Sequence, residues 1–67
     1  MKIYSLFLDI AYGGDVFLGV FQSLEQAQTA AQEYSDEDRL DDLVVYASEM
    51  GQLTKTAYLE EVWRLKA

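Results

Sequence analysis

Residues 18–34 read LGVFQSLEQAQTAAQEY, a short apolar run that passes through Gln22 into an amphipathic helix. Ser23 is a preferred N-cap residue, and the side chain of Gln26, three residues later, can reach back to Ser23 to complete a capping box. One face of this helix consists of Ala27, Ala30, Ala31 and Tyr34. Because three of these four side chains are alanine, we expect the helix to lie close against the sheet formed by the preceding strand.

An alternating apolar pattern before the helix predicts a β-hairpin. Residues 3–10 and 16–21 are rich in β-branched and aromatic side chains, and Gly13 and Gly14 suit the turn between them. Strict alternation directs one set toward the helix: Tyr4, Leu6, Leu8, Ile10, Val16, Leu18 and Val20. It directs a second apolar set to the opposite face: Ile3, Phe7, Phe17 and Phe21. A small monomer carries mostly polar residues on such a face, so we assign the second set to a dimer interface; the alternative is a contact with the chain's own C-terminal segment, which carries Trp63.

The second half of the chain predicts two more strands. Residues 43–50 fit a helical stripe ending at Gly51, but the β-branched and aromatic run at 44–46 favours a strand, which we choose. Residues 56–65 also suit a strand, with a terminal helix as the competing interpretation. The predicted fold is therefore α+β: a single domain over residues 1–67 in the order ββαββ, a small antiparallel sheet with one helix packed on one face.

The length and composition favour an oligomer. A domain of 67 residues buries only about 60% of the surface that its unfolded chain exposes. The sequence has neither cysteine nor histidine, so disulfides and the usual zinc ligand sets cannot add stability. Since 51% of the residues are hydrophobic, we expect more apolar surface than one small core can bury, and hence a homodimer.

The charge argues against two classes of ligand. With 12 acidic and 5 basic residues the net charge is −7, which opposes direct binding to nucleic acid or to an anionic membrane surface. No apolar stretch approaches the ~20 residues of a membrane span, and no signal-peptide cleavage site follows the first strand. We expect a cytoplasmic protein.

Acidic and aromatic residues form the predicted partner-binding site. Five acids crowd into residues 35–42, namely Asp36, Glu37, Asp38, Asp41 and Asp42. We expect them to form a solvated segment that attracts a basic partner protein, because their spacing does not match a calcium-binding loop. The expected anchors are Tyr46, Tyr58 and Trp63, since aromatic side chains dominate binding hot spots.

Catalytic chemistry has no support in the sequence. Glu60 and Glu61 are adjacent, and a strand sends adjacent carboxylates to opposite faces, whereas an acid–base pair must face one substrate. No serine or threonine stands near an evident general base. We therefore expect no catalytic residues, no metal and no cofactor. The sequence predicts a non-catalytic acidic regulator or accessory factor; the alternative is a phage-type inhibitor that mimics nucleic acid and blocks a nuclease or DNA-binding protein.

Residues 18–27 and the strand before them resemble a group of small uncharacterised bacterial and phage proteins. Their shared pattern is apolar-Gly-Val-Phe/Tyr-x-Ser-x-Glu-x-Ala, a strand-to-helix junction with a capping signal, and residues 58–63 resemble their closing strand of acidic and apolar residues. Residues 41–52 depart from the shortest members and leave the strand count open. The resemblance implies a structural junction and brings no catalytic residues with it.

Overall fold

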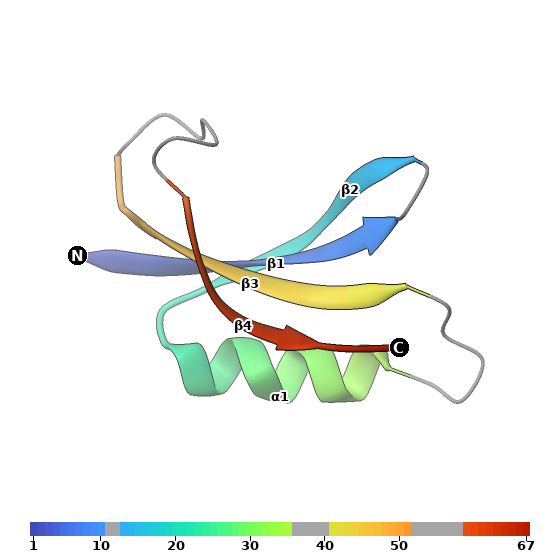
Figure 1. Ribbon diagram of the computed structural model, residues 1–67. Helices are drawn as coiled ribbons and strands as arrows, with labels where there is room; N and C mark the ends of the chain where they lie inside the picture. Colours follow the sequence, from blue (N-terminus) through green and yellow to red (C-terminus); the bar gives the residue numbers. More distant parts are fainter. Residues whose placement is uncertain (11–12, 36–40, 52–58) are drawn as a thin grey trace.

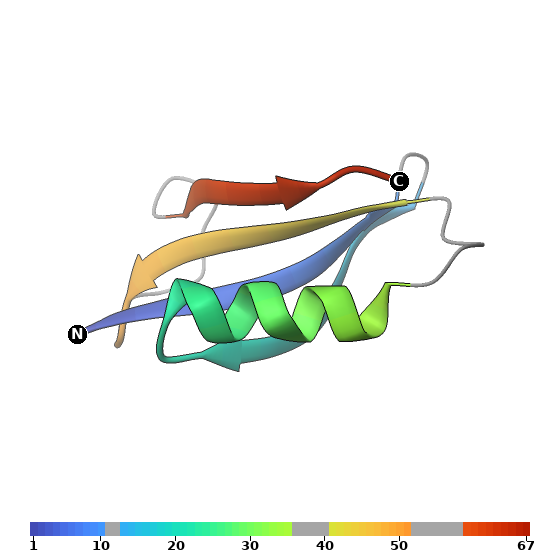
Figure 2. The same ribbon diagram turned by 90° about the horizontal axis from the view of Figure 1, so that it is seen from below.

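The computed structural model describes residues 1–10, 13–35, 41–51 and 59–67 (Figure 1). The elements follow in the order β1 (Lys2–Ile10), β2 (Gly14–Phe21), α1 (Leu24–Tyr34), β3 (Asp42–Glu49) and β4 (Glu60–Leu65). Within these residues the strands form one four-stranded antiparallel sheet in the order β2-β1-β3-β4. Figure 2, seen from below, shows α1 in front of this sheet. The α+β class predicted from the sequence is confirmed.

The start of α1 is fixed by its cap. The hydroxyl of Ser23 accepts a hydrogen bond from the backbone N–H of Gln26 at 3.1 Å, as the capping pattern predicts. The side-chain oxygen of Gln26 accepts from the backbone N–H of Gln22 at 3.2 Å, one residue earlier than we expected. A cap of this kind contributes about 1 kcal/mol to helix stability. It therefore sets the point at which the chain leaves β2 and turns back across the sheet.

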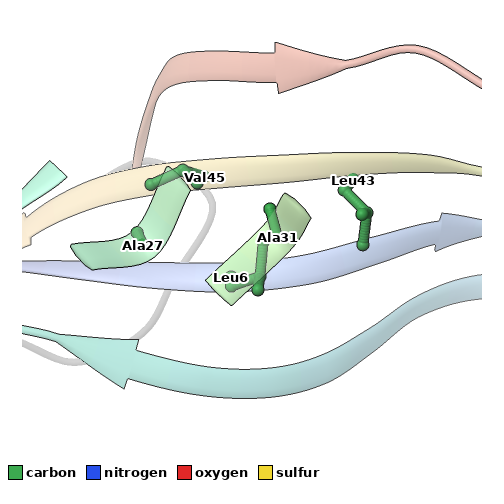
Figure 3. Close-up of a cluster of buried hydrophobic side chains, with 5 residues drawn as sticks. All are labelled: Leu6, Ala27, Ala31, Leu43 and Val45. Carbon is green, nitrogen blue, oxygen red and sulfur yellow. The ribbon is translucent and has the colours of Figure 1, made fainter. Parts of the chain in front are cut away.

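The core lies between α1 and the two central strands. Its buried members are Leu6 of β1, Leu43 and Val45 of β3, and the helix residues Ala27 and Ala31 (Figure 3). Each of these side chains is at most 2% exposed. The short alanine side chains let the helix backbone approach the sheet, as their spacing predicts. Around them lie partly buried side chains, including Tyr4, Leu8 and Leu18, on the side of the sheet that the sequence assigns to them.

A β-bulge in β2 changes which residues face the helix. Leu6 pairs with Gly19, but the next residue of β1, Phe7, pairs with Phe17, so Leu18 is an extra residue in β2. The alternation of faces is therefore reversed across Leu18. Strict alternation is wrong for two residues as a result. Val20 lies opposite Ser5 on the face away from the helix, and Phe21 packs against the helix-side core.

The absence of a side chain at Gly19 leaves room for the ring of Phe21. A Cβ atom at position 19 would lie 3.3 Å from Cζ of Phe21, closer than an ordinary van der Waals contact. The missing side chain therefore lets the aromatic ring lie back over the strand. Phe21, which we expected at a dimer interface, contributes to the core of its own chain for this reason.

The later strands follow the sequence prediction where the structure describes them. Residues 42–49 form β3, a central strand in which Leu43, Val44 and Val45 are all fully buried, and this explains the continuous apolar run. β4 occupies 60–65, while residues 56–58 lie outside the described part of the chain. Trp63 and Leu65 of β4 pack against the helix-side core.

Candidate functional site

The face of the sheet opposite α1, here called the outer face, carries a row of aromatic rings. The ring of Phe7 on β1 makes edge-to-face contacts with Phe17 on β2 and with Tyr46 on β3, each with 5.5 Å between ring centroids. This geometry suits the quadrupoles of the rings and fixes their orientation. The aromatic row, Phe17-Phe7-Tyr46, therefore crosses three neighbouring strands. Phe17, at the end of the row, is 58% exposed.

The other half of the outer face carries an ionic cluster around Arg64 of β4. One Nη atom of Arg64 lies 3.0 Å from a carboxylate oxygen of Asp9 and 2.8 Å from one of Asp42. The other Nη lies 2.9 Å from Glu61, to which Nε also donates at 3.3 Å. A guanidinium fork is well suited to such bidentate contacts. The Arg64 cluster, comprising Arg64, Asp9, Asp42 and Glu61, thus joins β1, β3 and β4 and has a net charge of −2 from three carboxylates and one cation.

A second bulge makes the Arg64 cluster possible. Val45 pairs with Trp63 and Tyr46 pairs with Glu61, so Val62 is the extra residue in β4. Without the bulge, residues 61 and 64 would point to opposite faces of the sheet. The extra residue therefore brings Glu61 to the side of Arg64.

Val44 lies between the aromatic row and the Arg64 cluster. It pairs with Phe7 on β1 and with Arg64 on β4, and its side chain is fully buried. The aliphatic stem of an arginine commonly covers apolar neighbours while its charged end stays in water. The two halves of the outer face therefore form one continuous surface, apolar toward β2 and charged toward β4.

The charges of the cluster shift the pKa values of its members. The hydrogen bond from the N–H of Ala67, followed by the contact with Arg64, lowers the pKa of Asp42. The hydrogen bond from Arg64 lowers the pKa of Glu61, and the same carboxylates raise the pKa of Arg64. Asp15 behaves differently, because burial and the nearby Asp9 raise its pKa. Burial, followed by the negative charge of Asp15, raises the pKa of Tyr46.

These shifts predict how stability depends on pH. Asp42 and Glu61 have lower pKa values in the folded chain, so they stabilise it above pH 4.5, the ordinary pKa of a glutamate carboxyl, and this contribution is lost as the pH falls through their lowered values. We expect acidification from about pH 6 to about pH 3 to reduce the free energy of unfolding less in Arg64→Met than in the wild type, because the variant lacks the part of this contribution that Arg64 supplies. Urea unfolding followed by circular dichroism at each pH measures the difference.

Asp15 provides the matched control for this pH dependence. Its pKa is raised in the folded chain, so its protonation favours folding and opposes the loss at low pH. Asp15→Asn removes that opposing contribution, and we expect this variant to lose more stability on acidification than the wild type. Equal losses in all three proteins would contradict the assigned pairing.

The structure brings together residues that the sequence assigned to two different contacts. Phe7 and Phe17, predicted for a dimer interface, meet Tyr46, predicted as a partner anchor, in the aromatic row. Ile3 also lies toward the outer face, beside Val20.

The remaining predicted site residues lie elsewhere. Trp63, predicted as an anchor, is partly buried against the helix-side core. Asp42 belongs to the Arg64 cluster, and Asp41 directly precedes β3. The other predicted residues lie outside the described part of the chain: Asp36, Glu37, Asp38 and Tyr58.

Sequence reasoning missed the apolar surface at the end of β2. Val20 is 53% exposed on the outer face. It helps to line a shallow hollow of about 300 Å³ together with Ile3, Phe21, Gln22 and Met50. The alternating pattern placed Val20 in the core, and only knowledge of the bulge at Leu18 would have moved it. The hollow extends the apolar part of the outer face to the edge of the sheet.

The groups on this surface suit contact with another molecule. Among the residues that the structure describes, no three histidine, cysteine, aspartate or glutamate side chains are arranged to hold a metal ion. Over the same residues, no helix combines the length and the apolar character needed to cross a membrane. The outer face offers exposed rings, a shallow apolar hollow and fixed carboxylates, which together suit contact with another protein.

A family model covers most of this surface. The model described as Domain of unknown function (DUF7336) matches residues 1–54. The chain belongs to this family. The part shared with the DUF7336 family spans β1, β2, α1 and β3, so it includes the whole aromatic row, whereas Glu61 and Arg64 on β4 lie beyond the match. No curated protein and no solved structure matches the chain.

Proposed function

We propose that this member of the DUF7336 family is a non-catalytic protein-binding protein that acts as a homodimer, a small acidic regulator or accessory factor of the cytoplasm. The observation that carries the proposal is the aromatic row on the outer face, which ends in the exposed ring of Phe17. Soluble monomers of this size rarely expose such an apolar patch to water, so we infer that another molecule covers it.

The packing within the row supports a role in binding. Phe7 holds both neighbouring rings in fixed edge-to-face contacts, so Phe17 loses little side-chain freedom when the second copy covers it, and Tyr46 loses little when a partner protein covers it. Rigid aromatic anchors surrounded by less energetic contacts are typical of hot spots in interfaces. The row therefore supplies affinity, and its strands supply a rigid support.

The charges around the row indicate the chemistry of the partner. Asp15 lies beside Asp9 next to the row, and the Arg64 cluster keeps a net negative charge at its far end. In a chain with a net charge of −7, these carboxylates attract a basic surface and raise its rate of association. We therefore propose a partner with a basic rim around an apolar patch.

Mimicry of nucleic acid is the less supported alternative. It requires fixed carboxylates that face a basic groove. The carboxylates of Asp9, Asp42 and Glu61 are fixed on strands, but each already binds the guanidinium of Arg64. The apolar row is also a poor imitation of a phosphate backbone. A partner-protein role accounts for both halves of the face.

Capture of interaction partners tests the proposed function. Immobilised wild-type protein and Tyr46→Ala are incubated with the same lysate, and bound proteins are quantified by mass spectrometry. Tyr34→Ala is the matched control, since Tyr34 is an aromatic residue of α1 that is 50% exposed away from the row. We expect Tyr46→Ala to reduce recovery of the specific partner on the order of tenfold or more, the typical effect of removing an aromatic hot spot, while Tyr34→Ala leaves it unchanged. Equal recovery by all three proteins would remove the row from the binding site.

A further inference from the structure

We propose that two copies of the chain pair antiparallel along β2, in a register that places Phe17 of each copy opposite Val20 of the other. This inference rests on the homodimer in the proposed function and specifies its contact. β2 is one edge of the sheet and β4 is the other. An edge strand presents backbone N–H and C=O groups that can pair with a strand of another chain.

The two edges differ sharply in charge. The sequence of β4 is EEVWRL, in which three of six residues are charged, and such charges discourage pairing at an edge. The sequence of β2 is GDVFLGVF, in which Asp15 is the single charged residue. In a chain with a net charge of −7, β2 is the edge at which two copies meet with the least repulsion.

The faces of the β2 side chains select one register. Phe17 and Val20 lie on the outer face, because they pair with Phe7 and Ser5. The helix side holds the remaining residues of the segment, Val16, Leu18, Gly19 and Phe21. Residues that oppose each other in an antiparallel pair share a face. Each residue of β2 must therefore meet a residue from the same side of the second copy.

One two-fold register meets this requirement along the whole segment. With Phe17 opposite Val20, Leu18 lies opposite Gly19 and Val16 lies opposite Phe21, so every pair shares a face. If the register is shifted by one or two positions in either direction, at least one outer-face residue lies opposite a helix-side residue. The spacing of three between Phe17 and Val20 comes from the bulge at Leu18, so the bulge makes the strand complementary to itself.

This register covers the exposed apolar residues of β2. Phe17 and Val20 are 58% and 53% exposed in the single chain. The two-fold axis produces two equivalent Phe17–Val20 contacts, so both residues of both copies are covered. Phe17 of the second copy lies next to the hollow that Val20 lines with Ile3 and Met50. Asp15 falls opposite Gln22, so the two copies do not place like charges against each other. The pairing leaves Tyr46 free for a partner protein.

Disulfide trapping tests the register directly, because the chain contains no cysteine and engineered thiols are the sole reactive ones. Phe17→Cys and Val20→Cys proteins are mixed and oxidised mildly. Cα atoms of opposed residues lie about 4.5–5.5 Å apart, within the range that a disulfide accepts. We expect this mixture to cross-link on the order of a hundredfold faster than a mixture of Phe17→Cys with Val62→Cys, since pairing raises the effective thiol concentration. Val62 is an exposed residue on β4, the opposite edge.

Light scattering on folded protein provides the second measurement. The wild type is expected at twice the 7.6 kDa of one chain, Val20→Lys at the monomer mass and the matched control Val62→Lys at the dimer mass. Circular dichroism establishes that each variant is folded. A dimer that survives Val20→Lys, or equal cross-linking in the two cysteine mixtures, overturns the β2 contact while the proposed homodimer stands. A monomeric wild type overturns both, and the capture experiment then tests partner binding by itself.

Discussion

Leu43→Ala is expected to destabilise the folded chain strongly and to lower its melting temperature. Leu43 is fully buried between α1 and the sheet, opposite Leu8 on β1 and Leu65 on β4. Truncation of a buried leucine costs about 3–5 kcal/mol, because apolar contacts are lost and a cavity remains. A domain of 67 residues has roughly 3–10 kcal/mol of stability in total. The variant therefore loses between about a third and all of its stability.

Thermal and urea unfolding followed by circular dichroism measure this loss. We expect the melting temperature to fall by roughly 15 °C or more, since each kcal/mol shifts it by about 4–8 °C in a domain of this size. Val62→Ala, at the 37% exposed bulge residue of β4, is the control and should change stability by at most about 0.5 kcal/mol. All proteins are compared at one concentration, because the proposed dimerisation would couple stability to concentration. Similar losses in both variants would contradict the assignment of Leu43 to the core.

Ala31→Leu is expected to cause the second-largest loss of stability. It adds volume to the core, whereas Leu43→Ala removes volume. Ala31 is fully buried in one cluster with Leu6 and Leu43, and Figure 3 shows it over Leu6 of β1. Three additional carbon atoms have no space there unless α1 moves away from the sheet. Overpacking of this kind costs about 1–3 kcal/mol and more where the backbone must shift.

Gln32→Leu separates overpacking from helix propensity. Gln32 is the next residue of α1 and is exposed, so leucine there meets water rather than the sheet. We expect this control to unfold within about 0.5 kcal/mol of the wild type, and Ala31→Leu to unfold at clearly lower urea concentration. A more stable Ala31→Leu would mean that space remains between the helix and the sheet.

Local sequence signals predicted the secondary structure around Leu43 and Ala31. Ser23 and Gln26 marked the start of α1, and the alanines at positions 27 and 31 marked its buried side, because capping and helical periodicity act over a few neighbouring residues. The alternation in residues 3–10 likewise placed Leu6 in the core. For β3, the propensity of Val44 and Val45 for strands outweighed a competing helical pattern, and burial on both sides explains why alternation was absent.

The outer face needed information that local patterns lack. Alternation has a period of two, and a bulge breaks that period without a sequence signal, so Val20 and Phe21 were assigned to the wrong faces. The contacts of Arg64 with Asp9 and Asp42 join residues 55 and 22 positions apart, which no short motif can reveal. Trp63 illustrates the same difficulty, because aromatic character suits an anchor and a core residue equally well.

In the proposed dimer, the charged residues of β4 also limit the size of the assembly. If both edges of the sheet accepted a strand, each added copy would expose a fresh edge and the array would lengthen into a fibril. The far edge of the sheet does not accept a further strand, because β4 carries the charges of Glu60, Glu61 and Arg64. In the proposed dimer, association through β2 therefore ends with two molecules, and Glu61, which also binds Arg64, helps Glu60 to protect the protein against amyloid-like polymerisation.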